Sequence, residues 1–343
     1  MKKVTLLALI MILAVSLVTG CSTATAGNKE GDIIKIAWYP NESGEDLKAA
    51  RDEIGKVIEK ATGKKVEHKL TTDYVITIEA VATGNVHLAF TGAQGYIEAH
   101  NKNKKVLPLV VNSGSSGTLK DALYYSWLNV KKGNENQYKT GDGYSIDNIA
   151  GKKFSFVSTS STSGFKVPSA GIASYFAKKD QWKNLKQEDL LEGGNRKFFN
   201  QVLFGGSHQG SAVNLLTDKA DVAAFCDVCV GNYVELAEGT ANKPGAVYRV
   251  RKDAAEPFNK VPGAEFVIIS STPVLNAPFI ANTEVLSDKS REAILQAMTS
   301  EEVAKNPKIF IPKGSKDKGL FAAPEKFLPV EDAWFNPIRE LSK

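Results

Sequence analysis

Alternating stretches of strand-type and helix-type hydrophobic patterning run along most of the chain. Residues 33–38 (IIKIAW) form an apolar run typical of a strand, and residues 44–61 repeat apolar positions at helical spacing. Residues 65–70 alternate as a second strand, a helix is expected over 74–83, and a third strand over 86–90. The order β-α-β-α-β predicts half of a doubly wound sheet.

The pattern then begins again. The expected elements of this second unit are strands over 122–130, 154–157 and 221–225 and helices over 164–177, 212–218 and around Tyr233. A strand over 278–281 and a helix over 288–298 are expected to return to the first unit. The second unit is therefore predicted to lie inside the chain, flanked by two pieces of the first.

This order predicts an α/β fold of two doubly wound lobes joined by a two-segment hinge. We expect the first lobe over 32–115 plus 273–343 and the second over 116–272. The hinge segments are expected at 113–125 and 266–273, where glycine, serine or proline adjoins a strand-type run. Ligands of such sheets bind in the crevice outside the carboxyl ends of the strands, and the crevice closes around them by hinge motion.

A charged and then apolar segment precedes this body. Lys2 and Lys3 are followed by apolar residues 4–18, a run shorter than the roughly 20 residues of a membrane-spanning helix. The segment predicts a signal peptide over 1–20. Its end, Val-Thr-Gly-Cys, resembles the bacterial lipobox, so we expect Cys21 to be lipidated; an ordinary secretory signal with a chance cysteine is the alternative.

Residues 21–31 are small and polar, as in a flexible tether. The expected location is therefore the extracytoplasmic face of the bacterial cell membrane, with the protein held there by its lipid anchor. No second apolar run approaches membrane length.

Charge and motifs exclude several classes of protein. The net charge is +5, of which Lys2 and Lys3 supply two, and the basic residues are interleaved with acids as on a solvated surface. A nucleic-acid partner is therefore not expected. The nucleophile elbow, the phosphate-binding loop, the HExxH zinc motif and the dinucleotide fingerprint are missing from the sequence, so we expect no enzyme and no cofactor.

Cys226 and Cys229 have C-x-x-C spacing. A redox pair, half a zinc site and a local disulfide all fit this spacing. A second such pair and a histidine at ligand spacing are missing, so no metal is expected. A structural pair, oxidised outside the cell, is the favoured interpretation.

The most informative segment for chemistry is residues 157–168 (VSTSSTSGFKVP), which lies between a predicted strand and a predicted helix. Backbone N–H groups in the first turn of a helix are unpaired and carry partial positive charge, and serine and threonine hydroxyls add further donors. Gly164 lets a ligand approach the backbone closely. The segment predicts an oxyanion site without a basic residue, and an ordinary serine-rich helix cap is the alternative.

This segment also resembles a known family. Ser161-Thr162-Ser163-Gly164-Phe165, followed by Val167-Pro168, is similar to the STSG-aromatic-x-x-P motif of the periplasmic phosphate/phosphite/phosphonate-binding proteins of ABC transporters. Further similar segments are Phe90-Thr91-Gly92 with Tyr96, Gly206 to Val213 around His208, Asp218 to Ala224, and Ser271-Thr272-Pro273. They follow one another in the family's order along nearly the whole body.

The resemblance implies roles for eight residues. Ser161, Thr162 and Ser163 would bind the oxygens of the anion, and His208 would approach from the same lobe, although a structural loop histidine is the alternative. Asp227 would accept a proton from a hydroxyl or amine of the ligand, but the two cysteines beside it depart from the family's motif. From the first lobe, Tyr39 and Thr91 or Tyr96 would close the other side.

The resemblance further implies a monomeric solute-binding lipoprotein that delivers a phosphonate, phosphite or phosphate to an ABC permease and its ATPase. The same role for an amino acid held by its carboxylate is the alternative, and an additional surface-adhesion role stays open. Of Tyr124, Tyr125 and Trp127 near the first hinge, most are expected to be packing residues, and one to be able to stack on a ligand ring.

Overall fold

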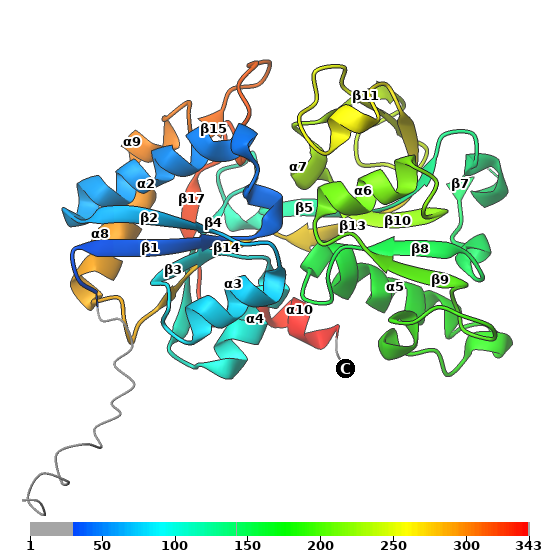
Figure 1. Ribbon diagram of the computed structural model, residues 1–343, viewed down its shortest axis with the longest axis horizontal. Helices are drawn as coiled ribbons and strands as arrows, with labels where there is room; N and C mark the ends of the chain where they lie inside the picture. The colour runs from blue at the N-terminus through cyan, green and yellow to red at the C-terminus, as the bar shows by residue number, and fades with distance from the viewer. Residues whose placement is uncertain (1–29, 142, 342–343) are drawn as a thin grey trace, which may run out of the picture.

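The chain forms two α/β units side by side (Figure 1), seen in a computed structural model that describes residues 30–141 and 143–341. The predicted signal peptide, Cys21 and all but the end of the predicted tether lie outside these residues. Within the described ranges, no helix has the length and apolar character needed to cross a membrane.

The first unit is built on a six-stranded sheet in the order β17-β4-β14-β3-β1-β2. These strands are β1 (Ile33–Trp38), β2 (Lys65–Leu70), β3 (Leu88–Phe90), β4 (Val106–Asn112), β14 (Pro278–Asn282) and β17 (Phe327–Pro329). Strands β2, β1 and β3 are parallel, and β14 enters antiparallel between β3 and β4. The first sheet therefore contains a strand from the far end of the chain, as expected for an interrupted lobe.

Helices cover both faces of the first sheet. They are α2 (Lys48–Thr62) and α8 (Asp288–Met298) on one face and α3 (Tyr74–Ala82), α4 (Ala93–Lys102) and α10 (Asn336–Glu340) on the other. Neighbouring residues of β1 serve different faces: Ile36 shares a buried cluster with Ile58 of α2, whereas Ala37 shares one with Ile78 of α3. Apolar residues on both faces of a strand are typical of a sheet covered by helices on both sides.

The second unit is built on a seven-stranded sheet in the order β11-β12-β13-β5-β10-β8-β9. These strands are β5 (Leu123–Lys131), β8 (Lys153–Phe156), β9 (Gln201–Phe204), β10 (Val222–Cys226), β11 (Val234–Glu238), β12 (Val247–Val250) and β13 (Glu265–Leu275). Helix α5 (Val167–Phe176) and helix α6 (His208–Leu216) lie on opposite faces. The predicted fold class of two doubly wound α/β lobes is confirmed.

Two segments carry the chain between the units. After β4 the chain passes through residues 113–122 into β5, and it returns from β13 through Asn276 and Ala277 into β14. Strands β5 and β13 pair with each other up to Leu123 and Leu275, so the two crossings are adjacent. The side chain of Asn276 donates to the carbonyl of Asn112 over 2.7 Å and ties the crossings together.

Three local predictions differ from the structure. The segment predicted as the second hinge, 266–273, belongs to strand β13; Pro273 is accommodated because β12 pairs only with the first part of that strand. The predicted helix near Tyr233 is a single turn, α7 (Asp227–Val230), followed by strand β11. Helix α6 begins at His208 rather than near 212, because the side chain of Ser207 caps it by accepting the N–H of Gly210.

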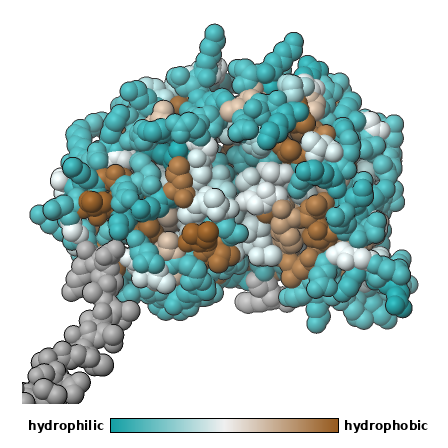
Figure 2. All heavy atoms as spheres, viewed as in Figure 1, coloured by the Kyte–Doolittle hydropathy of each residue, from teal (hydrophilic) through white to brown (hydrophobic). Residues whose placement is uncertain are grey.

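The face in Figure 2 is mostly hydrophilic, with apolar atoms in separate patches. Large apolar side chains that stay exposed include Leu70, Ile76, Phe204 and Val228. Scattered exposure of this kind is ordinary for a folded protein.

Candidate functional site

A cavity of about 590 Å³ lies between the two units. The first unit lines it with Tyr39 and Thr91, and the second with the Ser161–Ser163 segment, His208 and Asp227. Seven of the eight residues that sequence reasoning selected therefore meet at one cavity. Its position at the ends of β1, β3, β8 and β10 is the place where ligands of doubly wound sheets bind.

The serine-rich segment forms a tight turn into α5. Ser161 has extended backbone angles, and its Oγ accepts the N–H of Gly164 over 3.1 Å; the chain then makes a single π-helical turn, η7 (Thr162–Lys166). An added Cβ on Gly164 would lie 2.3 Å from a methyl group of Val157, so this position requires glycine. Because the Ser161 oxygen already accepts a bond, its own O–H proton can be donated to the hydroxyl of Tyr74, with which it interacts, or to a ligand.

Thr162 joins this turn to the first unit. Its Oγ1 accepts the backbone N–H of Gln94, at the N-terminus of α4, over 2.9 Å. An added Cβ on Gly92 would lie 2.6 Å from the same oxygen, so the close approach depends on glycine there. The beginnings of α4 and of η7 with α5 thus point at the same region from opposite units, where their partial positive charges favour an anion.

His208 adds a neutral donor. Its Nδ1 accepts the backbone N–H of Cys226 over 3.0 Å, and its Nε2 lies 3.4 Å from Oγ of Ser161. Burial lowers the pKa of His208 to about 3, so the ring is neutral at physiological pH. Because Nδ1 accepts, the single ring proton resides on Nε2, which faces Oγ of Ser161.

Tyrosine hydroxyls supply further donors. Tyr39, Tyr74 and Tyr124 line the cavity, and burial raises the pKa of all three above the usual range, so they stay protonated. Oη of Tyr74 accepts from Asn41 over 2.6 Å. In the described residues, Oη of Tyr39 and Oγ1 of Thr91 have no hydrogen-bond partner although both are buried. Buried polar atoms without partners are costly, and a ligand would satisfy them.

Carboxyl groups form a second kind of lining. Burial raises the pKa of Asp227 to about 6 and that of Glu42 to about 8, and it also raises the pKa of Glu325. Oδ1 of Asp227 accepts the N–H of Tyr125 over 2.9 Å. Oε2 of Glu42 is buried and has no hydrogen-bond partner in the part of the chain that the structure describes. These groups are acceptors when ionised, and Glu42 is a donor at neutral pH.

Hydrogen bonds across the cavity hold the units together. Oδ1 of Asn41 accepts the backbone N–H of His208 over 3.0 Å, and Nε2 of Gln209 donates to the carbonyl of Asn41 over 3.1 Å. Ser160 donates to Glu98 over 2.7 Å. The structure is therefore a closed arrangement of the two units.

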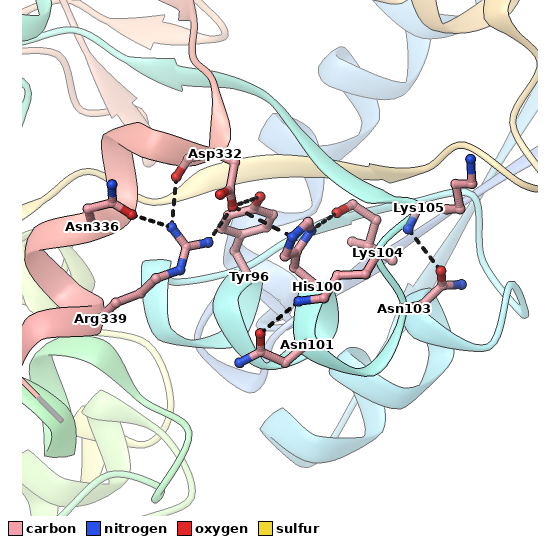
Figure 3. A network of polar contacts seen from close by, with 10 residues as sticks. Tyr96, His100, Asn101, Asn103, Lys104, Lys105, Asp332, Asn336 and Arg339 are labelled. Carbon is pink, nitrogen blue, oxygen red and sulfur yellow. Dashed lines mark hydrogen bonds and ion pairs between the residues drawn. The ribbon is translucent and has the colours of Figure 1, made fainter. Parts of the chain in front are cut away.

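Tyr96 is the predicted site residue that does not reach the cavity. Its hydroxyl donates to Asp332, which also pairs with Arg339 of α10 (Figure 3), and its ring packs against Phe335. His100 lies 3.9 Å from the same carboxylate. The structure places Tyr96 in the attachment of the C-terminal segment to α4, which is a correction of its expected place beside the ligand.

Sequence reasoning missed Tyr74, Asn41 and Glu42, and it placed Tyr124 in a group of three aromatics of which one was expected to be able to face the ligand. Tyr74 is the first residue of α3, capped by Asp73, and follows the predicted second strand. The rule that selected Ser161 (a polar side chain at a helix start after a strand) also applies to Tyr74. Trp127 also lines the cavity, whereas Tyr125 contacts Asp227 through its backbone N–H.

Cys226 and Cys229 form a disulfide, as the favoured interpretation predicts. Together with His208 they are one group whose ligand atoms lie within 4.8 Å of one another. With both sulfurs bonded to each other, the group offers no thiolates to a metal ion.

Comparisons with known proteins agree with this geometry. The family model described as the periplasmic substrate-binding protein of a phosphonate ABC transporter matches residues 36–323. The chain is 29% identical to the phosphate-import protein PhnD of Mycolicibacterium smegmatis over 255 residues, which are 73% of this chain and 72% of that protein.

Two solved structures share the fold. A binding protein component of an ABC phosphonate transporter from Pseudomonas aeruginosa matches with a TM-score of 0.62 and 19% identity, covering 90% of this chain and 85% of that one. PhnD1 from Prochlorococcus marinus, in complex with methylphosphonate, matches with a TM-score of 0.61 and 14% identity, covering 90% and 97%.

Proteins of this family are non-enzymatic transport components that act outside the cytoplasm. They bind a small-molecule substrate and imply a permease and an ATPase as partners. The family model spans most of the chain, from within the first strand to residue 323, and covers the cavity lining except Glu325. The chain belongs to the family of periplasmic substrate-binding proteins of phosphonate ABC transporters.

Proposed function

We propose that this protein is the lipid-anchored solute-binding component of an ABC importer and captures a small oxyanion, with a phosphonate as the first choice and phosphite or phosphate next. The observation that carries the proposal is the convergence of uncharged donors on one buried region. They are the hydroxyls of the Ser161–Ser163 turn, Nε2–H of His208 and the tyrosine hydroxyls.

Neutral donors favour an oxyanion for a physical reason. They are already buried and oriented, so the anion exchanges its hydration shell for fixed hydrogen bonds without reorganising the site. Hydrogen bonds to a charged partner contribute about 1.5–3 kcal/mol each, so three or four donors contribute about 4.5–12 kcal/mol before the cost of association, a range that includes micromolar affinity.

The carboxyl groups support a ligand that also carries a donor. Oδ1 of Asp227 accepts the N–H of Tyr125, and a buried carboxylate can accept a further hydrogen bond from an amine or hydroxyl of a ligand. Glu42 shares the same cavity. An aminoalkylphosphonate, with an anion at one end and an ammonium group at the other, satisfies both kinds of lining.

An amino acid is the second candidate ligand. Its carboxylate would occupy the oxyanion region and its ammonium group would face Asp227. The aromatic lining by Tyr124 and Trp127 favours a ring-bearing side chain. A surface-adhesion role beside transport has no feature of the cavity in its favour.

The anchor and the moving parts complete the proposal. Lipidation of Cys21 after cleavage of residues 1–20 would hold the protein beside the permease as a monomer, with residues 21–31 as the tether. The moving lobes would be residues 32–115 with 273–343 and residues 116–272.

A thermal-shift screen of the purified protein tests the proposed ligand. Methylphosphonate, 2-aminoethylphosphonate, phosphite, phosphate and the amino acids are each added in excess. A ligand at 100 times its dissociation constant stabilises the fold by about 2.7 kcal/mol, which a melting curve detects. A shift with an amino acid and with none of the oxyanions would overturn the first choice.

A further inference from the structure

The disulfide between Cys226 and Cys229 closes the turn that carries Asp227. Cys226 is the last residue of β10 and caps α7, and Cys229 is the third residue of that four-residue helix. The disulfide closes a ring that encloses Asp227 and Val228. The sequence resemblance to the family does not extend to these cysteines, so the ring is a feature of this chain that the shared fold does not explain.

One end of the ring is fixed by the sheet. Cys226 is fully buried and pairs with Ser126 of β5 in the centre of the second sheet. Its backbone N–H is the donor to Nδ1 of His208. This end does not depend on the disulfide, because strand pairing and the histidine contact hold its backbone.

The other end has fewer restraints. The carbonyl of Cys229 accepts from Nε2 of Gln209 over 3.1 Å and Val230 is buried, whereas Val228, inside the ring, is 57% exposed. A single helical turn is unfavourable by itself, because it fixes several residues for very few hydrogen bonds. The covalent bond adds a restraint within the turn to those from buried Val230 and from the Tyr125 N–H bond to Asp227.

We propose that the Cys226–Cys229 disulfide positions Asp227 for a ligand that carries both an oxyanion and a donor group, and that its reduction selectively weakens the capture of such a ligand. The inference rests on the proposed function, because it assigns Asp227 to the donor end of the ligand. The oxyanion end at Ser161–Ser163 lies on a separate segment and does not depend on the ring.

The reaction is a two-electron reduction by a small dithiol. One thiolate of the reagent attacks Sγ of Cys229, the partly exposed cysteine that lines the cavity, and displaces Cys226 as its thiolate. The second thiol of the reagent then releases Cys229. The protein gains two protons and two electrons as two thiols, and the reagent leaves as a cyclic disulfide.

Binding and oxidation are then linked in both directions. If reduction weakens the ligand's affinity by a given factor, the ligand must make the disulfide harder to reduce by the same factor. A tenfold effect corresponds to a shift of about 30 mV in the midpoint of this two-electron couple. A ring that only stabilises the fold would not distinguish two ligands that differ in their donor group.

The test uses calorimetric titration of the purified chain, oxidised and after treatment with dithiothreitol, with a chelator present so that the freed thiols and His208 capture no metal ion. The two ligands are 2-aminoethylphosphonate and methylphosphonate, which share the oxyanion and differ in the amine. We expect reduction to lower the affinity for 2-aminoethylphosphonate about tenfold or more, which is the effect of losing one charge-assisted hydrogen bond. The affinity for methylphosphonate should fall by less than about threefold.

Two variants serve as controls. Cys226→Ala/Cys229→Ala should reproduce the reduced protein without any reagent. In Asp227→Asn, which has already lost the ionised acceptor, reduction should change the affinity for neither ligand.

The outcomes separate the two claims. Equal weakening of both ligands, or no weakening of 2-aminoethylphosphonate, would overturn the positioning role. Failure of the oxidised protein to bind either phosphonate would instead overturn the proposed function.

Discussion

The backbone N–H of His208 donates to Oδ1 of Asn41 over 3.0 Å, and this bond joins the start of α6 in the second unit to the first unit. Asn41 also donates to the hydroxyl of Tyr74 and accepts from Gln209 through its carbonyl. One asparagine therefore links two ligand-facing side chains across the cavity. It is the most direct connection between closure and the ligand site.

Replacing Asn41 with alanine should weaken ligand binding because it destabilises the closed arrangement of the two units. The variant loses the bonds to His208 and Tyr74, each of which contributes about 0.5–1.5 kcal/mol, so the affinity should fall roughly tenfold. We expect the loss mainly in a faster dissociation rate, measured by stopped-flow fluorescence. Asn101→Ala, a change at an exposed residue of α4, is the control; equal rates in the two variants would contradict this role of Asn41.

Two helical glycines make a matched pair. An added Cβ at Gly95 in α4 would lie 1.8 Å from the hydroxyl of Tyr39, whereas at Gly171 in α5 it would meet nothing within 4 Å. Gly95→Ala should displace Tyr39 from the cavity and weaken oxyanion binding. Gly171→Ala should leave binding intact and stabilise the fold by about 0.5–1 kcal/mol, because alanine is the better helix former.

Calorimetry and chemical denaturation of both variants check this prediction. Unchanged affinity in Gly95→Ala would show that Tyr39 is not part of the ligand site.

Glu42 should make the stability of the unliganded protein fall as the pH rises. Burial raises its pKa to about 8 in the folded state, against an ordinary value of 4.5, so the folded protein holds a proton that the unfolded chain releases between those values. Stability is therefore lost progressively from about pH 4.5 to pH 8. Glu42→Gln cannot titrate and should lose less stability over this range.

Urea denaturation at pH 5 and pH 8 measures the difference, with the exposed Glu45→Gln as the control. If Glu42→Gln shows the same decline as Glu45→Gln, the buried carboxyl does not hold a proton at neutral pH.

Local chemistry explains how much of the site could be predicted. The turn at Ser161–Gly164 is encoded by consecutive residues that cap one helix, so it is visible in the sequence. Tyr124 and Glu42 reach the same cavity from β5 and from the turn after β1. Their convergence at the cavity depends on how the two units close, and no local sequence pattern predicts that closure.

The error at Tyr96 has a geometric cause. Gly92, just before α4, meets Thr162, and Gly95 lies on the side of α4 that meets Tyr39. The next residue along a helix is rotated by about 100°. Tyr96 therefore faces Asp332 and Phe335 instead. Tyr74 and Tyr124 line the cavity instead.

The bounds of several elements were more readily predicted than the crossings. The expected bounds of β1, β2 and α8 agree with the structure, because each has a clear periodicity. The return crossing was predicted at 266–273, a few residues too early, because the sequence Ser-Thr-Pro is typical of the end of a strand. Its partner β5 holds that segment in the sheet as far as Leu275.

The most direct test of the account compares the wild-type protein with Thr162→Val by calorimetric titration with methylphosphonate. Valine keeps the shape of threonine but removes the hydroxyl, and Thr217→Val, at the exposed residue that follows α6, is the matched control. We predict one-site binding to the wild type and to the control, and a loss of about 1–3 kcal/mol of binding free energy in Thr162→Val. Equal affinity in all three proteins, or no binding of methylphosphonate to the wild type, would contradict the oxyanion site.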